Sequence, residues 1–318
     1  MPTSHFLTKD EVLGFLADKL NIHLTGPDEC RPTMELLQRV CSAHSHAIPF
    51  TTVHLYNIPI GERRVETHEE IKQLGLLGVG GLCYSTNVFL HWILAGLGFK
   101  VHFQGTRFFN APDYDHLLNI VHLEDDGKRY LIDGSCNTFV SELPLCLDFD
   151  GAISPTSLQT MYDVRVVRQV VDNQADRFVL EFCWKNGAGV HPMAKVSADG
   201  WVQAMDFSLN YRSLEELPEV LQLVRGQYRD VTAVPILGCL LSRRFKAGKV
   251  LLIRGMMLTL QCEDRKRIHV PIKSRRQWLS VMAEHFGDVI SMEDLQRAID
   301  NYIRLTAPTE MPDGFCEI

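Results

Sequence analysis

The sequence predicts an α+β fold in which helices come first, strands follow, and a mixed α/β part ends the chain. Apolar residues recur at helical spacing before Gly98, whereas β-rich segments separated by turn residues begin after it. A helical pattern returns near the C-terminus. The chain has 318 residues, 46% of them apolar, which is too many for one small domain, so we expect two or three subdomains.

Capping residues mark the expected N-terminal helices. Thr8 is followed three residues later by Glu11, and Thr67 by Glu70, which is the capping-box pattern that satisfies the first free amides of a helix. Gly98 suits the C-terminal end of the most apolar helix. Together these signals predict helices that begin near Thr8, Thr33, Thr67 and Cys83.

Strands are expected in the second part of the chain. Residues 124–127, Glu-Asp-Asp-Gly, have the composition of a hairpin turn. A helical stretch is expected at residues 214–228 and a last helix after Ser291, with residues 310–318 as a tail. The expected strands cover residues 100–104, 117–123, 129–132, 164–171, 177–184 and 250–261.

Composition excludes several classes of protein. A net charge of -7 does not suit a protein that binds the phosphates of nucleic acid. The N-terminus has no basic region followed by an apolar core, and no apolar run approaches the ~18 residues that span a bilayer, so neither secretion nor membrane association is expected. Nine irregularly spaced cysteines without a Cys-x-x-Cys pair indicate the reduced thiols of a cytoplasmic protein.

Cys83 is the strongest candidate for a reactive residue. Gly80 and Gly81 let the backbone turn sharply just before it, and an apolar helix begins at it. The N-terminus of a helix stabilises negative charge, so a thiol there tends towards the reactive thiolate. A single cysteine among nine is more often a small buried apolar side chain, and the glycines and the helix start favour the reactive role for Cys83.

His116 and Asp133 are its expected partners. An imidazole can take the proton of a thiol, and a carboxylate bonded to the other ring nitrogen fixes the tautomer. Cys83, His116 and Asp133 lie within about fifty residues and have the residue types of a nucleophilic triad. Taken singly, His116 is one of thirteen histidines, and Asp133 has the alternative role of ending a strand.

The register of one hairpin decides whether His116 and Asp133 meet. A turn centred on residues 126–127 pairs Asp133 with Ile120 and leaves His116 roughly 13 Å away along the strand. A turn centred on residues 125–126 pairs Asp133 with Leu118 and places it diagonally opposite His116, within side-chain reach. The sequence permits the second register, because a glycine then follows the turn, but leaves both open.

Several segments resemble one known family in the same order along the chain. They are His46-Ala47-Ile48-Pro49-Phe50, Gly80-Gly81-Leu82-Cys83, His116-Leu117-Leu118, Tyr130-Leu131-Ile132-Asp133-Gly134 and a stretch within residues 242–259. The first resembles the Ile-Pro-Phe-Glu-Asn segment of arylamine N-acetyltransferases, the second their Arg-Gly-Gly-x-Cys nucleophile motif, and the next two their His and Asp strands. The chain is therefore identified as a divergent member of that family.

The resemblance implies a fold and a division of the chain. The family fold has three domains around a core like that of cysteine proteases. On this chain they correspond to a helical bundle with the nucleophile at residues 1–98, an antiparallel β-barrel with the His and Asp at residues 99–210, and an α/β lid with the C-terminal tail at residues 211–318.

The resemblance also implies a chemistry. Cys83 attacks the thioester of acetyl-CoA, or of another acyl-CoA, and an arylamine, hydrazine or related amine then takes the acetyl group in a ping-pong mechanism. His116 acts as base and Asp133 orients it. Acetyl-CoA is a co-substrate, and no permanently bound cofactor or metal is implied. The acceptor amine, the acyl length and the oligomeric state stay open.

The chain departs from the family pattern at several positions. Val79 stands where the family has Arg, Thr51-Thr52 where it has Glu-Asn, and Ser85 where it commonly has Gln or Glu. Ser135 follows Asp133-Gly134 where a glycine-rich turn is usual, whereas Asn87 keeps a family Asn. The missing Arg and Glu are candidates for lost partners of each other, which leaves the three site residues intact.

Two other groups of residues have a composition that suits a bound ligand. Cys41, His44, His46 and His54 have a spacing that zinc could use, although ordinary helix-end roles are favoured. Basic runs, which a solvated surface explains by default, are also suited to the phosphates of coenzyme A. They comprise Arg243, Arg244, Lys246, Lys249, Arg265, Lys266, Arg267, Lys273, Arg275 and Arg276.

The residue types alone are compatible with two functions other than acetyl transfer. A thiol hydrolase or transamidase uses the same three residue types, since water or another amine also resolves a thioester. A catalytically degenerate relative that binds coenzyme A or a partner is suggested by the changes at residues 51–52, 79 and 85.

Overall fold

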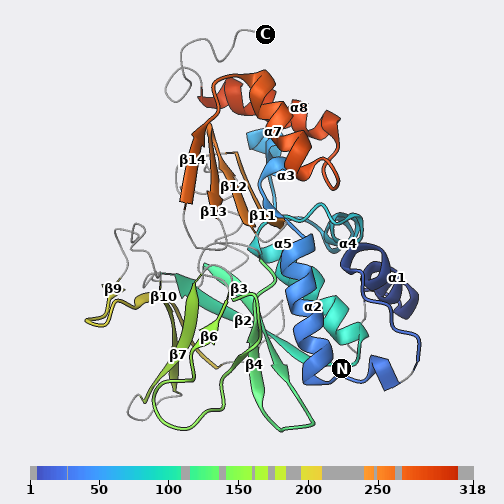
Figure 1. Cartoon of the computed structure of the whole chain (residues 1–318). Helices are drawn as coiled ribbons and strands as arrows, with labels where there is room; N and C mark the ends of the chain where they lie inside the picture. The colour runs from blue at the N-terminus through green and yellow to red at the C-terminus, as the bar shows by residue number, and fades with distance from the viewer. Residues whose placement is uncertain are drawn as a thin grey trace.

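The computed structural model has three parts that follow one another along the chain (Figure 1). N-terminal helices pack beside a strongly curved antiparallel sheet, and a smaller sheet with two helices lies at the end where the C-terminus is. The structure describes residues 6–26, 28–108, 115–135, 141–159, 162–170, 176–183, 195–209, 240–246, 249–261 and 267–306. The helices-first α+β fold predicted from the sequence is confirmed.

The N-terminal helices begin where the sequence predicts. Thr8 and Thr67 each form a complete capping box, with the side chains of Glu11 and Glu70 bonded back to the cap amides. Thr33 caps its helix by accepting a bond from the amide of Leu36. The helices are α1 (Lys9–Leu20), α2 (Met34–Ala47), α3 (Val53–Tyr56), α4 (His68–Leu77) and α5 (Cys83–Gly96), with short 3₁₀ turns η1 (Asp28–Cys30) and η2 (Ile60–Glu62).

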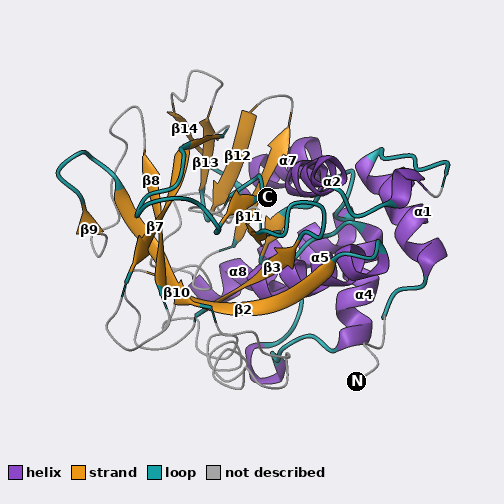
Figure 2. Ribbon diagram, turned by 90° about the horizontal axis from the view of Figure 1, so that it is seen from below, coloured by secondary structure: helices purple, strands orange, loops and turns teal. Residues whose placement is uncertain are grey.

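Helix α5 is the centre of this part of the fold. Almost every residue from Tyr84 to Leu94 is buried, which is why the helix is apolar on all sides. It packs against α1 and α4 and against strands β2 and β3 of the curved sheet. Figure 2 shows α5 beside β3, with α1, α2 and α4 on the side away from β7 and β8. Cys83 is the first residue of this helix, so the buried packing of α5 fixes the position of its backbone.

The curved sheet is antiparallel throughout its described strands. Its order is β5-β4-β3-β2-β10-β8-β7-β6, with β9 paired to β10. The strands are β2 (Lys100–Phe108), β3 (His116–His122), β4 (Arg129–Ile132), β5 (Leu145–Cys146), β6 (Ser157–Leu158), β7 (Asp163–Gln169), β8 (Arg177–Cys183), β9 (Lys195–Val196) and β10 (Val202–Ser208). Its nearly closed form agrees with the barrel that the resemblance implies.

The C-terminal sheet contains a strand from the N-terminal part of the chain. Its order is β1-β11-β12-β13-β14, so β1, which precedes the nucleophile, is an edge strand of a sheet formed mostly after residue 240. Helix α8 packs on α7 and on α3, which follows β1 directly. The elements are β1 (Phe50–Thr51), β11 (Leu241–Lys246), β12 (Lys249–Arg254), β13 (Met257–Gln261), β14 (Arg267–Pro271), α7 (Arg275–Phe286) and α8 (Met292–Thr306).

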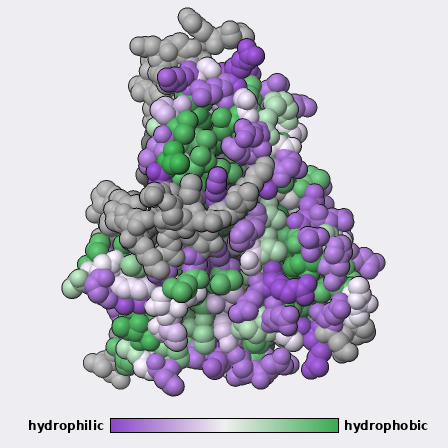
Figure 3. Space-filling view, in the orientation of Figure 1, coloured by the Kyte–Doolittle hydropathy of each residue, from purple (hydrophilic) through white to green (hydrophobic). Residues whose placement is uncertain are grey.

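The surface of this sheet is partly apolar. Hydrophobic side chains gather over β12–β14 in the space-filling view (Figure 3). Met257, Ile268 and Val270 are exposed apolar residues of β13 and β14. Within the described part of the chain, none of the helices has the length and apolar character needed to cross a bilayer.

The structure corrects some of the expected elements. Residues 250–261 are not one strand but a hairpin of β12 and β13, because Gly255 takes a positive φ of 54° and reverses the chain. Helix α7 and the two-residue strand β1 were not expected from the sequence. The expected helix at residues 214–228 and the tail at 310–318 lie outside the described residues. The domain boundaries at residues 98/99 and 210/211 stay a prediction.

A glycine turn joins β1 to the start of α5. The Thr51 amide donates to the Gly81 carbonyl at 3.0 Å, and Phe50 and Gly81 form a parallel bridge. Gly80 has a φ of 80°, and a Cβ on it would collide with the carbonyl oxygen of Pro49. Only glycine therefore lets this turn pass close to the Pro49 backbone and present Cys83.

Gly80→Ala is expected to destabilise the protein more than a matched glycine substitution does. Gly127→Ala is the control, because Gly127 also has a positive φ, of 67°, but nothing lies within 4 Å of its Cβ position. The control should cost about 1–2 kcal/mol of unfolding free energy in urea titrations. Gly80→Ala should cost a further 1–3 kcal/mol, roughly, because the turn must move away from Pro49. Equal losses of unfolding free energy in the two variants would contradict the close approach of Gly80 to the Pro49 carbonyl.

Candidate active site

Cys83 is the first residue of α5, directly after the cap residue Leu82. Its side chain is half-buried, so it is within reach of a solvent-borne reactant. Among the described residues no side chain caps this helix, so the first amides of α5 are not occupied by a capping group. Residues Cys83–Thr86 include no acid, and the positive end of the helix dipole acts on the thiol without opposition from a neighbouring carboxylate in that turn.

His116 and Asp133 are brought together by the hairpin of β3 and β4. Its register pairs His122 with Arg129 and Asn119 with Ile132, which centres the turn on residues 125–126. Continued by one residue, this register sets Asp133 opposite Leu118 and diagonal to His116. Gly127 follows the turn with a positive φ, as the second of the two predicted registers requires. That register is confirmed.

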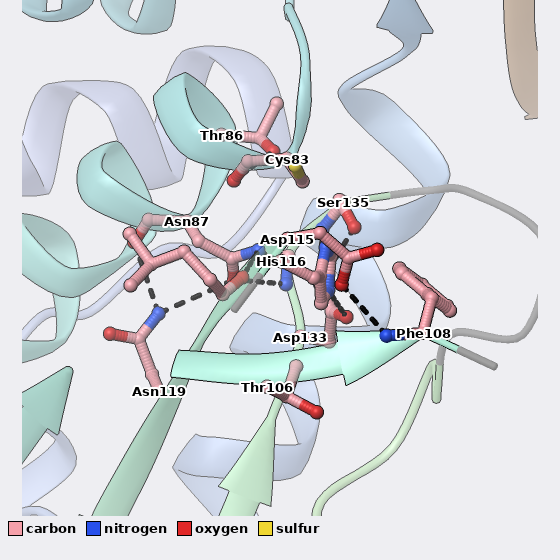
Figure 4. Close-up of polar contacts among 12 residues, drawn as sticks. Cys83, Thr86, Asn87, Thr106, Phe108, Asp115, His116, Asn119, Asp133 and Ser135 are labelled. Atoms are coloured by element: carbon pink, nitrogen blue, oxygen red, sulfur yellow. Dashed lines mark hydrogen bonds and ion pairs between the residues drawn. The ribbon is translucent and has the colours of Figure 1, made fainter. Parts of the chain in front are cut away.

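The side chains of His116 and Asp133 form a short buried bond. The distance from His116 Nε2 to Asp133 Oδ2 is 2.6 Å, and each side chain is only 1% exposed. Figure 4 shows the two residues beneath Cys83 at the start of α5. Because Asp133 takes Nε2, the ring nitrogen that remains for the thiol is Nδ1.

The pair keeps the imidazole protonated and the carboxylate charged. Burial lowers the pKa of His116, but the charge of Asp133 and the charge and hydrogen bond of Cys83 outweigh it and hold that pKa well above 6.5. Burial likewise raises the pKa of Asp133, and the charge and hydrogen bond of His116 more than reverse this. The arrangement therefore suits a thiolate–imidazolium pair stabilised by a buried carboxylate.

The second oxygen of Asp133 is held by three donors. Asn87 Nδ2 donates to Oδ1 at 2.9 Å, the Ser135 hydroxyl at 2.7 Å and the Ser135 amide at 3.0 Å. The amide of Gly134 donates to Asn87 Oδ1 at 2.7 Å, so the two residues that follow Asp133 are fixed as well. These bonds leave the carboxylate one orientation, with Oδ2 towards His116 (Figure 4).

Sequence reasoning did not assign roles to the residues behind Asp133. Asn87 was noted only as a family position, and Ser135 only as a departure from the family turn. One signal was present: Asn87 and His91 are four residues apart on an otherwise apolar helix, and so share a face. Another was Asn119, a buried polar residue within the apolar strand β3.

Thr51 and Thr52, which depart from the family pattern, form hydroxyl contacts between the end of β1 and β11. The hydroxyls of Thr51 and Ser242 are 2.7 Å apart, and the Thr51 hydroxyl also donates to the Leu241 carbonyl at 3.2 Å. The Leu241 amide donates to the Thr52 hydroxyl at 2.9 Å. Val79 packs against the hydrophobic core. Apolar packing and neutral hydrogen bonds thus occupy the positions where the family has charged or amide side chains.

Ser85 and His54 lie beside the glycine turn. Ser85 is buried, its hydroxyl lies next to the Cβ position of Gly81, and it donates to the Leu82 carbonyl at 3.4 Å. The ring of His54 lies near the same position of Gly81, and its Nε2 is 2.6 Å from Glu66 Oε1. This buried His54–Glu66 bond therefore lies beside the turn.

The cysteine and histidines considered for zinc have other roles. Cys41 lies in the core, where burial raises its thiol pKa and makes it inert. His46 Nδ1 is 2.6 Å from the Ser42 carbonyl, and His54 bonds to Glu66. Burial lowers the pKa of His44 to about 4, against the charge of Asp133. Among the described residues, no group of three or more His, Cys, Asp and Glu side chains is arranged to hold a metal ion.

The basic runs are not a simple solvated face. Arg243 and Arg244 are buried because β11 lies between β1 and β12. Arg244 donates to Asp288 at 2.6 Å and to the His285 carbonyl at 3.0 Å, and Arg275 pairs with Asp300. Two other members of the runs, at positions 265 and 266, lie outside the described residues.

Sequence comparison places the chain among acetyltransferases. A family model described as N-acetyltransferase matches residues 33–295. An arylamine N-acetyltransferase of Mycobacterium bovis is 28% identical over 158 residues, which is 47% of this chain and 52% of the relative. A probable arylamine N-acetyltransferase 3 of Dictyostelium discoideum is 29% identical over 111 residues, 33% of this chain and 36% of the relative. The matched sequence thus spans about half the length of the mycobacterial relative.

Solved structures share the fold over nearly the whole chain. The arylamine N-acetyltransferase of Mycobacterium marinum in complex with CoA has a TM-score of 0.70 at 18% identity, covering 91% of this chain and 99% of that one. The enzyme of Salmonella typhimurium has a TM-score of 0.70 at 17% identity, covering 92% and 99%. At these identities the likeness establishes the three-domain fold that was predicted.

Asp133→Asn is expected to destabilise the protein by an amount that depends on pH. A raised pKa in folded His116 stabilises the protein fully below its unfolded value, near 6.5, and the effect is lost as pH rises through the folded value. A lowered pKa in Asp133 stabilises above 3.8 and is lost as pH falls through the folded value. The difference in unfolding free energy between wild type and variant should therefore be greatest between about pH 4 and 6.5 and should shrink at higher pH.

Urea titrations at several pH values measure this difference. Asp300→Asn is the control, because Asp300 bonds to Arg275, whose guanidinium does not titrate in this range. The control should therefore cost a constant amount above about pH 5. A constant cost for Asp133→Asn over the same range would contradict the charged His116–Asp133 pair.

Proposed function

The chain belongs to the N-acetyltransferase family, and we propose that it transfers an acetyl group from acetyl-CoA to an arylamine, hydrazine or related amine through Cys83. The observation that carries the proposal is the buried His116–Asp133 bond beneath a half-buried thiol at a helix N-terminus. The Mycobacterium bovis relative is an arylamine N-acetyltransferase and the Dictyostelium discoideum relative a probable one, which supports this acceptor class. The Mycobacterium marinum complex supports coenzyme A as the carrier.

The first half-reaction acetylates the enzyme. The Cys83 thiolate attacks the thioester carbonyl, the carbon–sulfur bond to coenzyme A breaks, and the departing thiolate takes the proton of the His116 imidazolium. Cys83 is then an acetyl thioester, and His116 is neutral with its Nε2–H still directed at Asp133. Asp133 fixes the ring orientation and the tautomer, which keeps Nδ1 available for proton transfer.

The second half-reaction returns the enzyme to its starting state. The amine attacks the acetyl-cysteine carbonyl while His116 Nδ1 takes a proton from the amine nitrogen, and the Cys83 thiolate leaves. In both halves negative charge develops on the carbonyl oxygen. The first backbone amides of α5, uncapped by any described side chain, are the donors for that oxyanion.

The proposed reaction and the free cysteines indicate which co-substrate and which compartment the enzyme needs. Acetyl-CoA, or another acyl-CoA, is consumed as a co-substrate, and no permanently bound cofactor is required. The cysteines whose state the structure gives, Cys30, Cys41, Cys83, Cys146 and Cys183, are free thiols, and the irregular spacing of all nine suits a reducing compartment. We therefore propose a cytoplasmic location.

Incubation with acetyl-CoA is expected to add one acetyl group, at Cys83, and to release one equivalent of coenzyme A. Intact-mass measurement followed by peptide mapping detects the adduct, and a later addition of an aromatic amine or a hydrazine should discharge it. Cys83→Ala should not be acetylated. Cys30→Ala is the matched control, since Cys30 is a partly exposed free thiol remote in sequence from the site, and it should behave as wild type.

Other outcomes would replace the proposal. Acetylation that persists in Cys83→Ala would contradict it. Turnover of an amide without coenzyme A would indicate a thiol hydrolase or transamidase. Coenzyme A binding without any acetyl adduct, together with an unreactive Cys83 towards iodoacetamide, would indicate a catalytically degenerate relative.

A further inference from the structure

A line of buried polar side chains continues from Asp133 into the interface between α5 and β3. Asn119 Nδ2 donates to the Asn87 carbonyl at 3.0 Å and lies 3.4 Å from Asn87 Oδ1. Asn119 Oδ1 is 3.0 Å from His91 Nδ1. Asn87 and Asn119 are fully buried, in surroundings that are otherwise apolar. Buried polar groups of this kind are costly unless each finds a partner, and each does here.

The bonds of this line all run in one direction, towards the carboxylate. Asn119 Oδ1 is an acceptor, so His91 donates from Nδ1, and Asn119 donates in turn from Nδ2. Asn87 then donates from Nδ2 to Asp133 Oδ1. Donors aligned in series polarise one another and strengthen the last bond in the series.

Asn119 is one of three groups that fix which end of the Asn87 amide faces Asp133. The others are the amide of Gly134 and the carbonyl of Leu117, to which Asn87 Nδ2 donates at 2.8 Å. Asn87 Oδ1 lies between two donors, the amide of Gly134 and Nδ2 of Asn119. A flipped Asn87 would turn its oxygen towards the Asp133 carboxylate and its NH₂ towards those donors, and both contacts would be repulsive. With these three groups in place the NH₂ group must face Asp133.

His91 is itself held in one position and one charge state. Its ring stacks on Phe103, with centroids 3.8 Å apart and planes at 12°. Phe103 pairs with Asn119 across β2 and β3, so the two side chains share the face that α5 covers. Burial lowers the pKa of His91 to about 4, with Asn119 opposing this and His102 adding to it, so the ring is neutral at ordinary pH.

We propose that His91 and Asn119 are positioning residues for acetyl transfer: they hold the Asn87 amide so that it donates to Asp133, which in turn orients His116. This inference rests on the proposed function of Cys83. Neither residue touches the reacting atoms. They act by raising the fraction of molecules in which the thiolate–imidazolium pair is correctly formed. The titratable neighbours of Asp133 in this arrangement are His116 and His44.

The test measures the rate at which iodoacetamide alkylates Cys83 as a function of pH, with the alkylated site verified by peptide mapping. Asn119→Leu removes the donor and acceptor while keeping side-chain volume. His91→Phe keeps a ring that stacks on Phe103 but removes the donor, whereas His91→Asn loses the stack but places an amide nitrogen near the position of Nδ1. Phe103→Leu, which removes the stack and leaves every polar group, is the structural control.

Asn119→Leu and His91→Phe are expected to slow alkylation about three- to tenfold, the equivalent of one net hydrogen bond, and to move the acid limb of the profile to higher pH. His91→Asn should recover most of the rate and the position of the limb. Phe103→Leu should lower the midpoint of thermal unfolding without moving the limb.

Three results would overturn the inference. One is an unchanged profile in Asn119→Leu and His91→Phe, provided that wild-type Cys83 reacts rapidly at low pH. Another is an equal loss of the alkylation rate of Cys83 in His91→Asn and His91→Phe. The third is a shifted limb in Phe103→Leu, which would assign the effect to packing. Slow alkylation of Cys83 in the wild type itself would instead count against the proposed function, so the two failures are distinguishable.

Discussion

The buried charge of Asp133 is the constraint on which the rest of the site depends. A carboxylate that is removed from water must be compensated by donors or it will take up a proton. Asp133 receives bonds from His116 on β3, from Asn87 on α5 and from Ser135 just after β4. Three parts of the chain must therefore pack correctly before the carboxylate can be charged, and only a charged carboxylate keeps His116 protonated beside the thiol.

Local signals in the sequence predicted the starts of four N-terminal helices and narrowed one decisive hairpin to two registers. The capping boxes at Thr8 and Thr67 form as predicted, because they depend only on residues three positions apart. The turn composition and Gly127, which are also local, permitted the register that joins His116 to Asp133, and the pairing of β3 with β4 in the structure selects it. Contacts between distant segments could not be obtained in this way. The burial of Arg243 depends on strands on both sides of β11, and the role of Asn119 depends on how α5 lies against β3.

The departures from the family pattern lie around the glycine turn. Where the family has Glu and Arg, this chain has Thr51, hydrogen-bonded to Ser242 of β11, and Val79, packed against the core. Neutral hydrogen bonds avoid the cost of removing two charges from water, and they need a partner strand at close range. The two substitutions are consistent with each other: Thr51 finds a hydrogen-bond partner in Ser242, and Val79 finds apolar neighbours.

The pairing of β1 with β11 has a consequence for how the protein is made. Thr51 and Leu241 bond across 190 residues, and Thr51 also holds the turn that presents Cys83. During synthesis the N-terminal helices emerge and fold early, but β1 remains an unpaired edge until β11 has left the ribosome. The thiol therefore reaches its final setting only near the end of translation, and a chain that stops before β11 carries the nucleophile without the strand that braces it.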